Sequence, residues 1–298
     1  MSTESPNLWT IAKILEASKN YLVNKEIESA RLDAELLLAA SLQVNRVYLY
    51  THYDKPLNDE ERSAMRARLL RRGQHEPVAY ILEKREFYGR EFFVDKRVLV
   101  PRPETELLVD VVLEWCKKNH HEHVTIVDVG TGSGALAVTL ACELQDSKVL
   151  AIDVSEDALT VARRNAEKHQ CADRIQFLLG DLLQPLEAND FSKADIILSN
   201  PPYVATDERS QLPRDVEQFE PQAALFAGNL GLDVITRLLG DAPHYLNPLG
   251  LFVMEIGSKQ KNAVLQMCAK TLEWHDVVVL PDLAQLPRVL KAIRTNTP

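Results

Sequence analysis

The fold of this chain is decided by one short stretch, Asp128-Val129-Gly130-Thr131-Gly132-Ser133-Gly134-Ala135. An apolar strand pattern at 124–129 runs into it, and a helical pattern starts directly after it. Glycine lets the backbone turn tightly and lets a ligand approach closely, and the N-terminus of the following helix offers free N–H donors. The stretch therefore predicts a strand, a turn and a helix that bind a ligand together.

Two acidic residues at later strand ends indicate what that ligand carries. A second strand ends at Asp153, where a carboxylate is placed to accept hydrogen bonds from ribose hydroxyls. Asp181, at the end of a third strand, suits an adenine amino group, although it also fits a turn cap. We therefore expect a nucleoside-bearing cofactor. NAD stays open at this point, because Gly130, Gly132 and Ala135 also satisfy the Gly-x-Gly-x-x-Gly/Ala dinucleotide fingerprint.

The chain after Pro103 alternates helices with short apolar strands, which is typical of an open parallel sheet. The candidate strands lie at 124–129, 149–153, 175–179, 194–199, 251–256, 276–280 and 288–293. They predict an α/β domain with a Rossmann-like, seven-stranded sheet. Ligands of such sheets bind at the carboxyl edge where the strand order reverses. A reversal between the first and fourth strands would make the glycine loop and the end of the fourth strand face one crevice.

The fourth strand runs into Asn200-Pro201-Pro202-Tyr203. Asn200 offers a side-chain carbonyl, Pro201 a backbone carbonyl without an N–H of its own, and Tyr203 a flat aromatic face. Two converging acceptors suit a planar amino group, in a carboxamide or an adenine, and aim its nitrogen at a methyl group on a sulfonium. Alone, the tetrapeptide also fits a rigid turn. Together with the glycine loop and Asp153 it favours methyl transfer over dehydrogenation.

The first part of the chain differs from the rest. Residues 8–72 carry helical periodicity, with Ser29 as an expected N-cap and an acidic first turn after Asn58. Aromatic residues around Gly89 predict a hairpin between 86 and 100. We expect a helical domain at 1–80, a hairpin linker at 81–103 and a second domain at 104–298. The arginine run at 62–72 fits either a solvated helix face or a surface that meets an acidic partner.

Composition excludes several classes of protein. The chain has 298 residues, 34 basic and 43 acidic side chains, a net charge of −9 and 46% hydrophobic residues, which is ordinary for a soluble protein of two domains. We find no membrane span and no secretory signal, and expect a cytoplasmic protein. The four cysteines are far apart, so we expect reduced, mostly buried thiols and no metal site. The acidic balance predicts no direct binding of nucleic acid.

At this point the chain resembles a known family, the glutamine N5-methyltransferases that modify peptide chain release factors. Beyond the glycine loop and the tetrapeptide, the resemblance rests on Glu76-Pro77-Val78-Ala79-Tyr80-Ile81, Arg85-Glu86-Phe87-Tyr88-Gly89, Val100-Pro101-Arg102-Pro103-Glu104-Thr105-Glu106 and Glu255-Ile256-Gly257. The tetrapeptide alone is shared with amino-methylating enzymes that act on DNA, RNA and protein. The Pro-Arg-Pro-Glu-Thr-Glu stretch is far more specific, although it also fits a linker and an ordinary helix start.

The resemblance implies roles for the residues of these motifs. It assigns S-adenosylmethionine as the cofactor, held by Asp153, by Asn200 and by the loop residues Gly130, Thr131, Gly132, Ser133 and Gly134. It places Leu182, next to Asp181, against the adenine. It gives Asn200, Pro201, Pro202 and Tyr203 to the glutamine amide of the release factor's Gly-Gly-Gln loop, and makes 1–80 a substrate-recognition domain and 104–298 the methyltransferase catalytic domain. One departure is Leu230, where the family commonly has an aspartate.

Three other functions stay open. The same chemistry could act on a glutamine of a ribosomal protein, or on adenine N6 in DNA. DNA methylation normally needs a basic recognition region, and this acidic chain offers only the short arginine run. A non-catalytic module that binds release factors is a different class, and the intact tetrapeptide and glycine loop argue against it.

Overall fold

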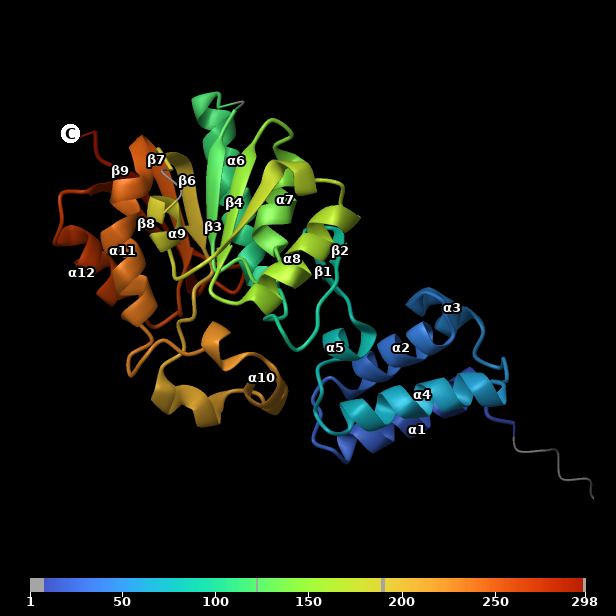
Figure 1. The fold of residues 1–298 in the computed structure, drawn as a ribbon. Helices are drawn as coiled ribbons and strands as arrows, with labels where there is room; N and C mark the ends of the chain where they lie inside the picture. Colours follow the sequence, from blue (N-terminus) through green and yellow to red (C-terminus); the bar gives the residue numbers. More distant parts are fainter. Residues whose placement is uncertain (1–7, 122, 189–190, 297–298) are drawn as a thin grey trace, which may run out of the picture. The chain divides into compact units, whose positions relative to one another are not determined.

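The structure, a computed structural model, describes residues 8–121, 123–188 and 191–296. The chain forms two compact units, and each is described by itself (Figure 1). The helical unit comprises Met1–Glu83 and Pro213–Phe219, and the sheet unit comprises Lys84–Leu212 and Glu220–Pro298. A short segment that follows the tetrapeptide in sequence therefore belongs to the helical unit.

The helical unit is built from short amphipathic helices. They are α1 (Ile11–Val23), α2 (Ala30–Ser41), α3 (Arg46–Thr51), α4 (Asp59–Arg72), α5 (Val78–Leu82) and α10 (Arg214–Phe219). Helix α4 starts where the acidic turn predicts it, because Asn58 and Glu61 form a capping box around its first turn. The core of the helical unit contains the fully buried Ile11, Leu37 and Leu49 together with neighbouring apolar side chains.

Two local expectations in this unit need correction. Ser29 precedes α2 but caps no backbone N–H, since its hydroxyl donates to Asp33 Oδ2 at 2.8 Å. The arginine run is not a uniformly solvated face, because Arg72 is buried and pairs with Asp33 at 2.7 Å. Arg72 also lies 3.6 Å from Asp215 of α10. A buried guanidinium thus ties together α2, α4 and the 213–219 segment.

The sheet unit begins with a hairpin and continues with alternating helices and strands. Its strands are β1 (Arg85–Phe87), β2 (Arg90–Phe92), β3 (Thr125–Val129), β4 (Lys148–Asp153), β5 (Ile175–Leu179), β6 (Ala194–Ser199), β7 (Leu246–Glu255), β8 (Trp274–Pro281) and β9 (Pro287–Arg294). Its α-helices are α6 (Glu106–Asn119), α7 (Ala135–Glu143), α8 (Glu156–Lys168), α9 (Gln184–Ala188), α11 (Asp233–Tyr245) and α12 (Lys261–Ala269). Short 3-10 turns lie at Pro103–Thr105, Ala172–Arg174, Thr206–Gln211 and Gln222–Ala224.

The sheet has seven strands in the order β5-β4-β3-β6-β7-β9-β8. The seven-stranded α/β fold is confirmed, and the order reverses between β3 and β6, as the crevice requires. The sheet is not fully parallel, however. Strand β9 lies between β7 and β8 and runs antiparallel to both. A short turn at 282–286 joins β8 to β9, and such a turn can only connect antiparallel neighbours.

Helices cover both faces of this sheet (Figure 1). Helices α6, α7 and α8 pack on one face, where Val112, Leu140 and Ile126 are fully buried. Helices α9, α11 and α12 cover the other face, with Leu238 and Phe252 at its centre. Strands buried on both faces explain the near-continuous apolar runs of the sequence, and leave the strand ends as the place for polar residues.

Candidate active site

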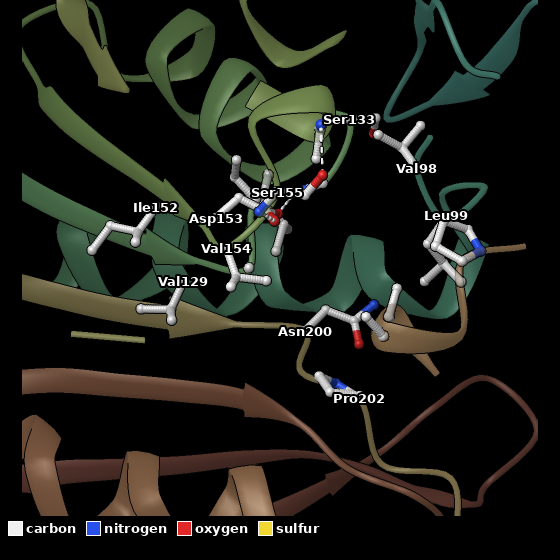
Figure 2. A pocket seen from close by; sticks show the side chains of 18 of the residues that line it. Val98, Leu99, Val129, Ser133, Ile152, Asp153, Val154, Ser155, Asn200 and Pro202 are labelled. Carbon is white, nitrogen blue, oxygen red and sulfur yellow. Dashed lines mark hydrogen bonds between the residues drawn. The ribbon is translucent and has the colours of Figure 1, made fainter. Parts of the chain in front are cut away.

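A cavity of about 490 Å³ lies at the carboxyl ends of β3, β4, β5 and β6. All of its lining residues belong to the sheet unit. Figure 2 shows Asp153 and Ser133 on one side of it, with Asn200 and Pro202 on the other. The volume lies within the range of small-molecule and cofactor sites.

The glycine loop between β3 and α7 adopts backbone conformations that favour glycine. Gly130 and Gly132 have φ values of 74° and 55° and line the cavity. A Cβ on Gly130 would meet nothing within 4 Å, so this glycine leaves room for a ligand. Gly134, with φ of 78°, lies outside the lining, and its Cβ would come within 3.1 Å of Ala162 on α8. The first two glycines open the cavity, and the third allows close helix packing.

Asp153, the last residue of β4, lies beside the glycine loop. Its Oδ2 accepts from the backbone N–H of Gly132 and its Oδ1 from that of Ser155, both at 2.9 Å. Burial raises the pKa of Asp153, and these backbone hydrogen bonds lower it in part. Each oxygen keeps a further lone pair. The carboxylate is thus held rigidly beside the cavity with acceptor capacity left for hydroxyl groups.

Asp181 and Leu182, after β5, also line the cavity. The carboxylate of Asp181 is partly engaged, since Arg237 of α11 pairs with it at 2.6 Å. Leu182 has a positive φ of 50° and packs against the core below α11. The sequence did not indicate the Arg237 pairing, because it joins residues from two elements that are far apart in the chain.

Asn200 follows β6, and its side chain points into the cavity (Figure 2). Its Nδ2 donates to the hydroxyl of Thr105 at 3.0 Å. The Thr105 hydroxyl in turn donates to Oε2 of Glu255 at 2.6 Å. Thr105 and Glu255 are 4% and 1% exposed, so this chain of hydrogen bonds is buried. Thr105 is more than a helix start, because its side chain caps no N–H of α6.

The remaining tetrapeptide residues are placed differently from one another. Pro202 lines the cavity, while Pro201 is buried and is not part of the lining. Tyr203 lies outside the lining and donates its hydroxyl to Oε1 of Glu255 at 3.1 Å. Both oxygens of Glu255 thus accept hydrogen bonds from the site. Burial raises the pKa of Glu255, and the bonds from Thr105 and Tyr203 act against that rise.

One rim of the cavity is held by the Pro-Arg-Pro-Glu-Thr-Glu stretch. Arg102 pairs with the buried Glu220 at 2.6 Å, and the same carboxylate accepts from the backbone N–H of Val100 at 3.2 Å. Leu99 and Pro101, beside them, line the cavity. The arginine between two prolines therefore fixes residues 99–101 against the segment that begins at Glu220.

A further buried carboxylate, Asp128, supports the glycine loop. Asp128 is fully buried, and its Oδ2 accepts from the Thr131 hydroxyl at 2.7 Å and from the N–H of Ala137 at 3.2 Å. Its Oδ1 has no hydrogen-bond partner among the described residues. Burial raises the pKa of Asp128 to about 7, while the two hydrogen bonds lower it. Asp128 braces the turn from below and does not line the cavity.

The Leu230 departure falls in the loop at 227–232. Leu230 is 73% exposed, so its side chain contributes little to the loop. Gln260 holds the loop instead, because its Nε2 donates to the backbone carbonyls of Tyr203 at 3.0 Å and Gly231 at 2.9 Å. Gly231 has φ of 66°, and a Cβ there would lie 2.1 Å from the Tyr203 carbonyl oxygen. Backbone contacts, not the residue at 230, therefore set the position of this loop.

The sequence patterns predicted nine of the residues that line this cavity, but gave no firm role to two residues, Thr105 and Glu255, that hold Asn200 in place. Gly130, Thr131, Gly132, Ser133, Asp153, Asp181, Leu182, Asn200 and Pro202 are brought together around the cavity. Sequence reasoning gave no role to Glu255 and left Thr105 open between a helix start and a cleft motif. The available signal was a glutamate at the end of the apolar strand 251–256, which needs a polar partner if buried.

Three further features of the described residues bear on the class of protein. None of their helices is long and apolar enough to cross a membrane. Within the same described ranges, no group of three or more His, Cys, Asp or Glu side chains is arranged to hold a metal ion. All four cysteines are free, and Cys116, Cys171 and Cys268 are buried, which confirms the expected thiols.

Comparison with known proteins agrees with this geometry. Residues 13–82 match the PrmC N-terminal domain, and residues 120–290 match a methyltransferase domain. The catalytic domain of hMettl16, solved with the MAT2A 3'UTR hairpin 6, superposes with a TM-score of 0.55 at 16% identity, over 78% of this chain and 82% of that chain. This likeness concerns the fold. The sheet unit is thus a methyltransferase domain, and NAD is not its cofactor.

Two relatives cover nearly the whole chain. A release factor glutamine methyltransferase of Geobacter sulfurreducens is 42% identical over 90% of this chain and 92% of its own length. One of Rhodopirellula baltica is 38% identical over 97% of both chains. The chain belongs to the release factor glutamine methyltransferase family.

The cavity fits S-adenosylmethionine, the cofactor of this methyltransferase. Gly130 leaves open space where any side chain would intrude, and Asp153 offers carboxylate oxygens to ribose hydroxyls. Apolar side chains, Leu182 and Phe226 among them, also line the cavity and suit the faces of an adenine ring. The residues present therefore match the polar and apolar parts of the cofactor.

Proposed function

We propose that this enzyme transfers a methyl group from S-adenosylmethionine to the side-chain nitrogen of the glutamine in the Gly-Gly-Gln loop of peptide chain release factors. One observation carries the proposal: Asn200 lies at the reversal point of the sheet, in the same cavity as the glycine loop. Its amide orientation is defined by Thr105. An oriented acceptor beside a methyl-donor pocket suits a planar amide nitrogen.

We assign the binding roles as follows. The glycine loop and Asp153 hold the cofactor, whose sulfonium supplies an electrophilic methyl group when bound. Leu182 contacts the adenine, and Asp181, already paired with Arg237, contributes at the rim. Gly134 acts through helix packing, because its Cβ position faces Ala162.

We assign substrate binding to the tetrapeptide. Oδ1 of Asn200 and the carbonyl of Pro201 accept the two N–H groups of the substrate amide, which raises electron density on its nitrogen and aims its lone pair. Pro202 forms the wall of the cavity beside them. Tyr203, which lies outside the cavity lining, contributes through its hydrogen bond to Glu255. No general base is needed, because the nitrogen becomes acidic once it is alkylated.

We also propose that the helical unit recognises the folded partner. Its family match, the exposed Arg66 and a small hollow lined by Trp9, Ile14 and Arg66 support a binding role. Since release factors act in translation, we place the reaction in the cytoplasm. The boundaries at 80 and 103 remain part of this proposal.

A direct comparison of substrates tests the function. The purified enzyme is incubated with methyl-labelled S-adenosylmethionine and, in parallel, with a release factor, isolated ribosomal proteins or adenine-containing DNA. We expect label in the release factor alone. Label in ribosomal protein or DNA with none in the release factor would contradict the proposal, and no label in any of them would favour a non-catalytic module.

A further inference from the structure

The strongest unassigned feature is the buried hydrogen-bond chain from Glu255 through Thr105 to Asn200. It joins the end of β7, the start of α6 and the residue after β6. Thr105 ends the 3-10 turn Pro103–Thr105, which runs directly into α6, and its side chain caps no backbone N–H of that helix. Glu255 is buried at a position where an apolar residue would cost less.

The chain of bonds has a direction. A hydroxyl group has one proton to donate, and Thr105 Oγ1 donates it to Oε2 of Glu255 at 2.6 Å. Towards Asn200 the same oxygen can only accept, so the Asn200 amide must present its Nδ2 to Thr105. The two atoms of an amide point in different directions, and Oδ1 is therefore turned away from Thr105. Among the described residues Oδ1 receives no hydrogen bond, while Asn200 lines the cavity.

Glu255 sets this direction because both of its oxygens accept. Tyr203 donates to Oε1 and Thr105 to Oε2, and Arg288, on the adjacent strand β9, favours the negative charge. An amide at position 255 would carry a donor as well as an acceptor. A donor facing Thr105 would turn the Thr105 proton towards Asn200 and make Oδ1 the favoured partner. The Asn200 amide would then present N–H groups to the substrate.

The geometry points to Glu255 and Thr105 as positioning residues that lock the Asn200 amide with its oxygen towards the substrate, so that the site accepts an amide and rejects a carboxylate. This inference rests on the proposed function, since it assumes that a glutamine nitrogen is the methyl acceptor. It adds a specificity device to that function. A glutamate side chain would place an oxygen without a proton against Oδ1, and two facing acceptors repel.

Three variants test the device in the full-length enzyme. Glu255→Gln and Thr105→Val should lower the single-turnover methylation rate of a release factor about 10²- to 10³-fold, as expected for loss of one preorganised polar contact. Thr105→Ser keeps the hydroxyl and should restore the rate to within a few-fold of wild type. The affinity for S-adenosylmethionine, measured by calorimetry, should change far less. Glu114→Gln, an exposed site on α6, is the matched control and should leave the rate unchanged.

A second readout separates orientation from general structural damage. A release factor with glutamate in place of the Gly-Gly-Gln glutamine serves as a competitive inhibitor. It should inhibit Glu255→Gln at least about tenfold more tightly than it inhibits wild type, because the reversed Asn200 amide would donate to the carboxylate. A merely destabilised site would bind it more weakly or equally.

The outcomes discriminate between the two claims. A wild-type enzyme that leaves the release factor unmethylated would refute the proposed function, and this inference with it. If the wild-type enzyme is active and both Thr105→Val and Glu255→Gln methylate within threefold of its rate, the positioning role is overturned while the proposed function stands. If Glu255→Gln does not fold, the contrast between Thr105→Val and Thr105→Ser decides, and equal losses in both would overturn it.

Discussion

Replacing Asp153 by asparagine should weaken S-adenosylmethionine binding without unfolding the cavity. Asp153 holds Gly132 and Ser155 through one oxygen each. An asparagine keeps one acceptor, so the turn loses one backbone hydrogen bond at most. The larger loss is the charge-assisted contact to a ribose hydroxyl, worth about 1.5 to 3 kcal/mol. At 1.4 kcal/mol per tenfold change, the dissociation constant should rise about 10- to 100-fold.

Isothermal titration calorimetry measures this effect directly. Asp157→Asn is the matched control, because Asp157 is exposed in the first turn of α8 and carries the same charge. It should bind the cofactor like wild type. Thermal unfolding without cofactor should show Asp153→Asn still folded. If folded Asp153→Asn binds S-adenosylmethionine within twofold of wild type, Asp153 is structural and the assigned ribose contact is wrong.

Three further predictions concern other parts of the chain. Arg72→Met should lower the free energy of unfolding of the helical unit by about 3 to 5 kcal/mol in urea titrations, because it leaves the buried Asp33 without its ion pair. Arg62→Met removes an exposed ion pair with Asp59 and should lower it by less than about 1 kcal/mol. Burial raises the pKa of Asp128 from its ordinary 3.8 to about 7, so the stability of the wild-type protein should fall as pH rises through that window. In thermal melts, Asp128→Asn should therefore gain up to about 4 kcal/mol over wild type by pH 8. A stability difference between the two proteins that stays constant across pH would contradict this. Arg66→Glu should reduce kcat/KM for the intact release factor several-fold, with a larger reduction at low salt and with unchanged cofactor affinity. An unaltered kcat/KM would show that Arg66 is not part of the recognition surface.

Local patterns in the sequence were sufficient for the framework of the fold. Apolar runs located each strand of the large sheet, although β7 begins at Leu246, five residues before the expected start at 251. The glycines at 130, 132 and 134 all adopt positive φ. The expected reversal between β3 and β6 is confirmed. These features depend on backbone sterics and on burial of whole strands, which a single sequence records directly.

The features that the sequence did not predict depend on tertiary contacts. The antiparallel insertion of β9 follows from a hairpin at 282–286 whose pairing leaves no clear periodic signal. The pairing of Arg237 with Asp181 and the burial of Arg72 join residues from separate elements. The link from Glu255 to Asn200 needs β7 beside β6 and the start of α6 above them. Spacing along the chain contains none of this information.

The central claim is that the methyl group reaches one glutamine nitrogen. The most direct measurement is tandem mass spectrometry of the release-factor peptide that contains Gly-Gly-Gln, after reaction with the purified enzyme and S-adenosylmethionine. The account predicts a mass gain of one methyl group, confined by fragment ions to the glutamine side chain and lost with Asn200→Ala. A methyl group on any other residue of the release factor would contradict it, and so would a glutamine that stays unmodified after prolonged reaction with excess enzyme and S-adenosylmethionine.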